Sequence, residues 1–107
     1  MEETPLELVL TSEADGERAE ALARTLLERR LAACVSLHPC RSLYHWQGQI
    51  ESGSEVLLLL KTHGERLAEL REALGQLHSY ETPMWIHWRA ASEGEYGRWL
   101  AASLALP

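Results

Sequence analysis

Apolar and polar positions recur along this chain with two different periods, and the change of period separates predicted strands from predicted helices. Pro5–Thr11 is a short apolar run typical of a strand. Ser12 is predicted to cap a helix whose apolar residues return every three or four positions as far as Leu31. From Ala33 the period becomes two, which predicts a strand with alternating faces.

The second half of the chain repeats the order strand, helix, strand. Thr62, with a glutamate three residues later, is predicted to cap a second helix, and Pro83–Ala90 is predicted to form the last strand. Ser92 has the same spacing to a glutamate and is predicted to open a short closing helix. The order β-α-β-β-α-β plus a C-terminal helix predicts an α+β, ferredoxin-like single domain over residues 1–107.

The segment Leu31–Thr62 is predicted to be a hairpin of two long strands that turns at Gln47-Gly48. One arm would span about 50 Å if straight, whereas a compact domain of this length is about 34 Å across. Pro39 predicts a bend or bulge in the first arm, and the apolar run Val56–Lys61 predicts a strand buried on both faces. Because the end of the hairpin is apolar and overhangs the domain, either the hairpin folds back on itself or other chains cover it, and we expect other chains to cover it.

Composition narrows the possible functions. The chain carries a net charge of −6 and has no basic cluster, which argues against nucleic-acid binding. No apolar run is long enough to cross a membrane and no secretory leader is recognisable, so a cytoplasmic protein is expected. Cys34 and Cys40 would lie about 20 Å apart on an extended strand, too far for a disulfide, so reduced thiols are expected.

Several motifs, in matching order and spacing, resemble those of the CutA divalent-cation-tolerance proteins over nearly the whole chain. These segments are ERRLAACV at 28–35, YHWQGQI at 44–50, EVLLLLKT at 55–62, HSYETP at 78–83 and YGRWL at 96–100. The resemblance implies a homotrimer in which long hairpins interlock, a structural kinship with PII-type signalling trimers, and a role in tolerance to copper and other divalent metals. It implies no settled enzymatic reaction, and the sequence shows no catalytic triad, phosphate loop or paired-histidine zinc motif.

The chain departs from the family pattern where metal chemistry would matter. Ser79 replaces a proline and Met84 replaces a glutamate that could supply an oxygen ligand. Thr11 stands where some relatives carry a metal-linked cysteine, and Leu77 where some carry a second histidine. Of these candidate ligands only His78 remains.

The candidate metal ligands are His78 and Cys34, for a borderline or soft ion such as Cu²⁺ or Zn²⁺. Each has a simpler interpretation: Cys34 fills a small buried space, and His78 is a loop imidazole bonded to the backbone. Cys34 and His38 share one strand face, but their Cα atoms would be about 13 Å apart, too far to hold one ion together.

Lys61 and Tyr80 are the candidate residues for a small anionic ligand. Lys61 ends a strand beside the start of the second helix, where backbone N–H groups favour anions. This pair supports an alternative function, a PII-like signalling module that binds an anionic metabolite between subunits; a trimeric scaffold that binds a protein partner is a third. The four tryptophans and Tyr44 are expected in subunit interfaces rather than in a ligand site.

Overall fold

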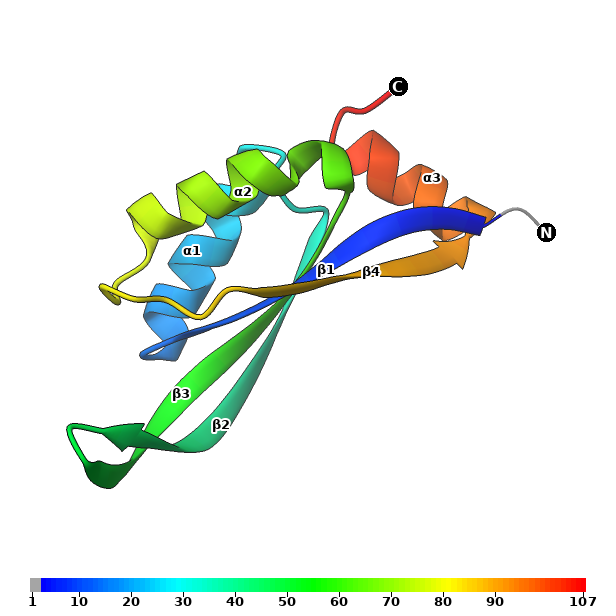
Figure 1. Ribbon diagram of the computed structural model, residues 1–107. Helices are drawn as coiled ribbons and strands as arrows, with labels where there is room; N and C mark the ends of the chain where they lie inside the picture. The colour runs from blue at the N-terminus through cyan, green and yellow to red at the C-terminus, as the bar shows by residue number, and fades with distance from the viewer. Residues whose placement is uncertain (1–2) are drawn as a thin grey trace.

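The computed structural model describes residues 3–107 as a four-stranded antiparallel sheet with three helices (Figure 1). The strand order is β2-β3-β1-β4, which confirms the predicted α+β, ferredoxin-like arrangement. The elements are β1 (Glu3–Glu13), α1 (Gly16–Glu28), β2 (Cys34–Trp46), β3 (Gln49–Thr62), α2 (Gly64–Leu77), β4 (Ile86–Glu93) and α3 (Gly94–Ser103).

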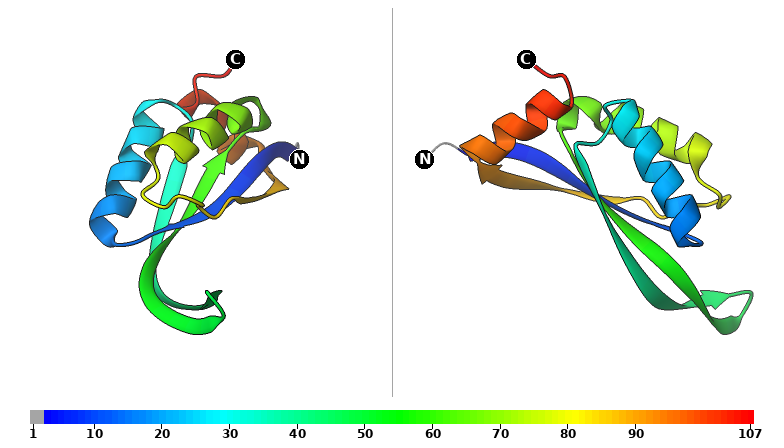
Figure 2. Two further views of the ribbon diagram at one scale, coloured as in Figure 1. Left: turned by 60° about the vertical axis from the view of Figure 1, so that its left-hand side comes forward. Right: turned by 180° about the vertical axis from the view of Figure 1, so that it is seen from behind.

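Helices α1 and α2 lie side by side against one face of the sheet (Figures 1 and 2). The apolar stripe of α1 meets alternate residues of the central strands, because a helical period of 3.6 and a strand period of two each gather apolar side chains on one side. The resulting core includes Val9, Leu22, Leu26, Leu58, Leu60 and Leu70.

The hairpin formed by β2 and β3 extends beyond the rest of the sheet and curls at its end (Figure 2). Pairing of β1 with β3 stops at Val56, so the outer halves of β2 and β3 pair only with each other. The chain measures 49 × 25 × 21 Å, and its radius of gyration of 14.8 Å exceeds the value of about 13 Å expected for a compact domain of this size. The predicted turn is confirmed, since Gln47 and Gly48 both have positive φ, as in the tight turns that join antiparallel strands.

The predicted helix starts were wrong, because the strands before them are longer than expected. Ser12 pairs with β3 inside β1, and Asp15 caps α1 instead, its Oδ1 accepting from the Arg18 N–H at 2.8 Å. Thr62 likewise lies in β3, and the Nδ1 of His63 caps α2 by accepting from the Glu65 N–H at 3.0 Å.

β4 and α3 also begin later in the chain than predicted. β4 is Ile86–Glu93 rather than 83–90, so Ser92 pairs with Thr4 inside the sheet and caps no helix. Glu93 holds the N-cap position of α3 without a side-chain hydrogen bond.

Of the bend or bulge expected at Pro39, the bulge is absent, since β2 and β3 keep one register from Cys34 to Trp46. β2 is an edge strand, where a proline is tolerated at positions whose N–H would point away from the sheet. The predicted two-sided burial of β3 is wrong for the single chain: Leu58 and Leu60 are buried under the helices, whereas Leu57 and Leu59 are half-exposed.

We call the second side of the sheet the open sheet face. α3 covers only one end of it, where Leu100 and Leu104 pack on Leu6. By strand alternation and register, its members include Leu8, Leu10, Ser12, Cys34, Ser36, His38, Leu57, Leu59, Lys61, Ile86 and Trp88.

Two fully buried threonines make a matched stability test. Among residues 3–107 the hydroxyl of Thr11 has no hydrogen-bond partner, whereas that of Thr62 donates to the Leu31 carbonyl at 2.7 Å. We expect Thr11→Val to raise the free energy of unfolding by about 1 kcal/mol and Thr62→Val to lower it by about 1–2 kcal/mol. Urea unfolding of both variants measures the difference; a loss of similar size in both would contradict this account of the Thr11 hydroxyl.

Candidate functional site

The principal polar cluster begins with Glu13, a carboxylate that is 1% exposed at the end of β1. Its Oε1 accepts from the Ala14 N–H at 3.0 Å and from the Ser79 hydroxyl, and its Oε2 accepts from the Ser79 N–H at 3.0 Å. Burial raises the pKa of Glu13, but these bonds outweigh it and hold the pKa below its ordinary value of 4.5. Glu13 is therefore an ionised group that fastens the loop after α2 to β1.

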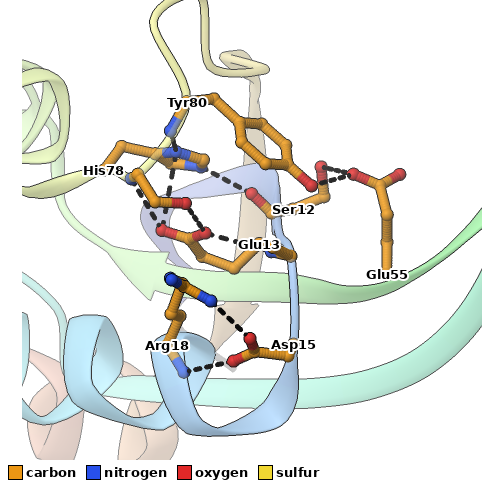
Figure 3. A network of polar contacts seen from close by, with 9 residues as sticks. Ser12, Glu13, Asp15, Arg18, Glu55, His78 and Tyr80 are labelled. Atoms are coloured by element: carbon orange, nitrogen blue, oxygen red, sulfur yellow. Dashed lines mark hydrogen bonds and ion pairs between the residues drawn. The ribbon is translucent and has the colours of Figure 1, made fainter.

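His78 lies beside this carboxylate with a fully buried side chain (Figure 3). Its Nε2 lies 2.5 Å from the Ser12 carbonyl oxygen, and its Nδ1 lies 3.0 Å from the Tyr80 backbone nitrogen. A carbonyl only accepts and a backbone N–H only donates, so the proton is on Nε2 and the lone pair of Nδ1 is used. Neither nitrogen of His78 is available to a metal ion in this arrangement.

Tyr80 connects the polar cluster around His78 to the hairpin. Its hydroxyl donates to Oε2 of Glu55 at 2.7 Å, and the Ser12 hydroxyl donates to the same oxygen at 3.1 Å (Figure 3). Burial raises the pKa of Glu55, but hydrogen bonds from Ser42, Tyr80 and Ser12 lower it overall. Burial and the adjacent carboxylate raise the pKa of Tyr80, so the phenol stays protonated and keeps its donor role.

Beside Tyr80 there is a groove of about 720 Å³ between the outer hairpin and the loop before β4. The hairpin contributes aromatic walls through Tyr44 and Trp46, and the loop contributes Tyr80 and Met84. Its charged lining residues are Glu55 and Glu81; among the described residues, no lysine, arginine or histidine lines it. We call this the hairpin groove.

The structure separates Lys61 from Tyr80. Lys61 lies on the open sheet face, where its Nζ donates to Ser36 Oγ at 2.6 Å and contacts Cys34 Sγ at 3.6 Å. Tyr80 instead contacts Glu55, which precedes Lys61 by six residues on β3. Six residues of strand place Glu55 about 20 Å from Lys61. Within one chain the two predicted anion-binding residues therefore form no common site.

Cys34 is a partly exposed free thiol on the open sheet face, directly opposite Lys61. It lies on β2, whereas His78 packs against the end of β1, so the two predicted metal ligands are not brought together. Over residues 3–107 there is no group of three or more Cys, His, Asp or Glu side chains placed to hold a metal ion. The side chains of a single chain thus do not fit a resident divalent metal.

Sequence reasoning missed Glu13 and Glu55. Glu13 falls in the first turn of the helix predicted after Ser12, where acidic residues are common, and Glu55 falls at an ordinary polar position of the predicted hairpin. Two signals were available: Glu13 lies two residues after the predicted strand Pro5–Thr11, and Glu55 opens the EVLLLLKT segment that resembles the family motif.

Acid should weaken the structure through these carboxylates. Because the pKa of Glu13 in the folded state lies below its ordinary value of 4.5, the ionised carboxylate stabilises the fold above pH 4.5. This stabilisation is lost as the pH falls through the folded-state pKa of Glu13. We expect Glu13→Gln to be less stable than the unsubstituted protein at pH 7 and to lose less stability on going from pH 5 to pH 3. Urea unfolding across this range, with exposed Glu28→Gln as control, tests it; equal slopes for Glu13→Gln and the unsubstituted protein would contradict the assignment.

Comparisons with known proteins converge on one family. The family model of the CutA1 divalent ion tolerance protein matches residues 7–103. A divalent-cation tolerance protein CutA from Pectobacterium atrosepticum is 41% identical over 99 residues, covering 91% of this chain and 90% of that protein.

Solved structures agree with the sequence comparison. The structure of CutA from Synechococcus elongatus superposes with a TM-score of 0.92 at 36% identity, covering 96% of each chain. A protein from Archaeoglobus fulgidus, described as a periplasmic divalent cation tolerance protein CutA, gives a TM-score of 0.86 at 33% identity, covering 92% of this chain and 98% of that one.

Proposed function

Because the chain belongs to the CutA1 divalent ion tolerance family, we propose that it acts in the response to divalent metal ions such as Cu²⁺, and that its working form is a homotrimer. The observation that carries the trimer is the uncovered apolar surface. Ile86 and Trp88 on the open sheet face are 51% and 43% exposed, and Ile50 on the hairpin is 73% exposed. On the open sheet face, Ile86 and Trp88 lie directly beside Leu8 and Leu10, and an apolar sheet face of this kind is typical of a protein interface.

We further propose that metal ions bind weakly between chains, as transported or buffered ions, rather than at a centre inside one chain. Cys34 is the soft ligand best placed for this, because its free thiol lies on the face that assembly would cover. His78 is a weaker candidate, since both ring nitrogens already have partners. Zn²⁺ and Cu⁺, the form that copper takes beside reduced thiols, are the ions suited to thiolate ligands.

Anaerobic titration of the pre-reduced protein with Zn²⁺ and Cu⁺, without an added thiol, tests Cys34 against a control in the same strand. Cys40 is also free and partly exposed. Cys34→Ser should weaken binding, whereas Cys40→Ser should leave it unchanged. Equal affinities for the unsubstituted protein and Cys34→Ser would remove Cys34 as a ligand.

The alternative of an anionic metabolite held by Lys61 and Tyr80 remains a prediction that one chain alone cannot satisfy. Such a site would need Lys61 of one chain to approach Tyr80 of another. The nearest surroundings of Tyr80 are acidic, through Glu55 and Glu81, and this favours the metal-response role over the anion-binding one.

A cytoplasmic location is also part of the proposal. No helix within residues 3–107 is long and apolar enough to cross a membrane. Because the Archaeoglobus fulgidus relative is described as periplasmic, cell fractionation is the appropriate measurement, and recovery in the periplasmic fraction would contradict this location.

A further inference from the structure

Helix α2 is capped by a histidine rather than by one of the short polar residues that usually cap a helix. Nδ1 of His63 accepts a hydrogen bond from the Glu65 N–H at 3.0 Å, so this nitrogen carries a lone pair and no proton. Histidine ordinarily gains its second ring proton at a pH of about 6.5, and both nitrogens of the protonated ring are donors. The cap of α2 therefore exists only while His63 is neutral.

The first turn of α2 depends on this cap. Gly64 follows His63, and glycine is a poor helix former. The helix dipole also opposes a positive charge at the start of a helix. The carboxylate of Glu65 in the same turn is exposed, so water and salt screen its attraction for the ring. Protonation of His63 should therefore loosen the first turn of α2.

A second partner for the imidazole ring lies across a small cavity. Glu7 of β1 is only 6% exposed, and its Oε2 has no hydrogen-bond partner among residues 3–107. Glu7 and His63 line the same cavity of about 120 Å³, which gives the ring room to turn. A buried carboxylate oxygen without a partner is costly, and a protonated imidazole would donate to it a charge-assisted hydrogen bond.

The other charged groups around Glu7 do not satisfy this oxygen. Nε of Arg89 lies 3.8 Å from Oε2, beyond hydrogen-bond distance, and its side chain is 79% exposed. Nδ1 of His87 lies 3.4 Å from the other oxygen, Oε1, at the long limit of a hydrogen bond. Oε2 of Glu7 is therefore the acceptor that remains for a protonated His63.

The first turn of α2 also holds the end of α3. Arg66, the third residue of α2, donates to the Leu104 carbonyl from Nε at 3.3 Å and from Nη2 at 2.8 Å. Leu104 follows α3 and packs on Leu6 at the covered end of the open sheet face. Arg30 donates separately to the Ser103 carbonyl, so a looser first turn of α2 should loosen α3 without detaching it.

We propose that His63 is a proton-operated switch. In its neutral form the ring caps α2; in its protonated form the ring leaves the Glu65 N–H, pairs with Oε2 of Glu7, and loosens the hold of Arg66 on α3. Glu7 alternates along β1 with Leu6 and so projects to the side of the sheet that α2 covers, away from the open sheet face. The switch therefore uses no surface that the proposed trimer would bury.

Hydrogen exchange of the full chain, read by mass spectrometry and corrected for intrinsic rates, tests the switch at pH 7.5 and pH 5.5. In the unsubstituted protein, protection of residues 64–67 should fall about threefold to tenfold at pH 5.5, and protection of residues 94–103 about twofold or more. His63→Ser caps α2 at both pH values and should show neither change. Equal pH dependence in the two proteins would overturn the proposal, and a loss confined to residues 64–67 would overturn the coupling to α3.

Two further variants identify the partner of the protonated ring. Glu7→Gln removes the charge that would receive the ring, so the loss of protection at residues 64–67 should require a lower pH than in the unsubstituted protein. His87→Gln removes the other imidazole that contacts Glu7 and should keep the loss of protection. An unchanged midpoint in Glu7→Gln would overturn the pairing with Glu7, and disappearance of the pH dependence in His87→Gln would overturn the assignment to His63.

Discussion

Replacing His78 with alanine should lower the free energy of unfolding by about 3–5 kcal/mol. The substitution removes a fully buried ring and leaves two groups without their His78 partner, the buried Ser12 carbonyl and the partly buried Tyr80 N–H. A loss of this size would show that His78 is a structural residue, and urea unfolding at pH 7 measures it.

Two further substitutions separate the roles of the ring nitrogens. His78→Gln keeps an N–H donor that can reach the Ser12 carbonyl, and His78→Asn keeps an oxygen acceptor for the Tyr80 N–H. Each should recover part of the stability lost in His78→Ala. If His78→Ala were as stable as the unsubstituted protein but lost metal binding, the imidazole would be a ligand and this interpretation of His78 would be wrong.

The order of elements could be predicted from the sequence because it depends on local periodicity. The helix of period 3.6 before Leu31 and the strand of period two after Ala33 are separate patterns, and Gln47-Gly48 supplies the positive φ angles that the turn requires. The overhang followed from length alone, since two long paired arms cannot fit on a small domain.

The helix starts could not be predicted in the same way. Ser12 and Thr62 have the side chains and spacing of N-caps, but β1 and β3 continue through both positions, with Ser12 opposite Leu57 and Thr62 opposite Glu7. Register with a distant strand decided these positions, and local capping chemistry carries no information about register.

The candidate site shows the same limit. His78 contacts the carbonyl of a residue 66 positions away, so the sequence alone could not show that both ring nitrogens have partners. Glu13 and Glu55 gained their roles only when the fold brought the loop after α2 onto the end of β1 and onto the hairpin. Chemistry assembled from distant segments lies beyond what motif spacing can predict.

Introducing a charge on the exposed apolar surface should separate the proposed trimer into folded monomers. Ile50 is 73% exposed and Ile86 51% exposed in the single chain, so aspartate at either position can remain hydrated and should cost the monomer little. In an interface the same carboxylate would be buried without a partner, at a cost of several kcal/mol for each chain. Ile50→Asp and Ile86→Asp should therefore weaken association by at least about a thousandfold.

Sedimentation velocity at micromolar concentration, combined with circular dichroism, distinguishes dissociation from unfolding. The unsubstituted protein should sediment at about three times the 12.1 kDa mass of one chain, and both variants at the mass of one chain with unchanged secondary structure. Leu27 is 37% exposed on α1, which covers the opposite side of the sheet from the open sheet face, and Leu27→Asp should remain trimeric. An unsubstituted protein that is a stable 12.1 kDa monomer at micromolar concentration would refute the assembly, because an apolar sheet face would then be tolerated in water without a partner.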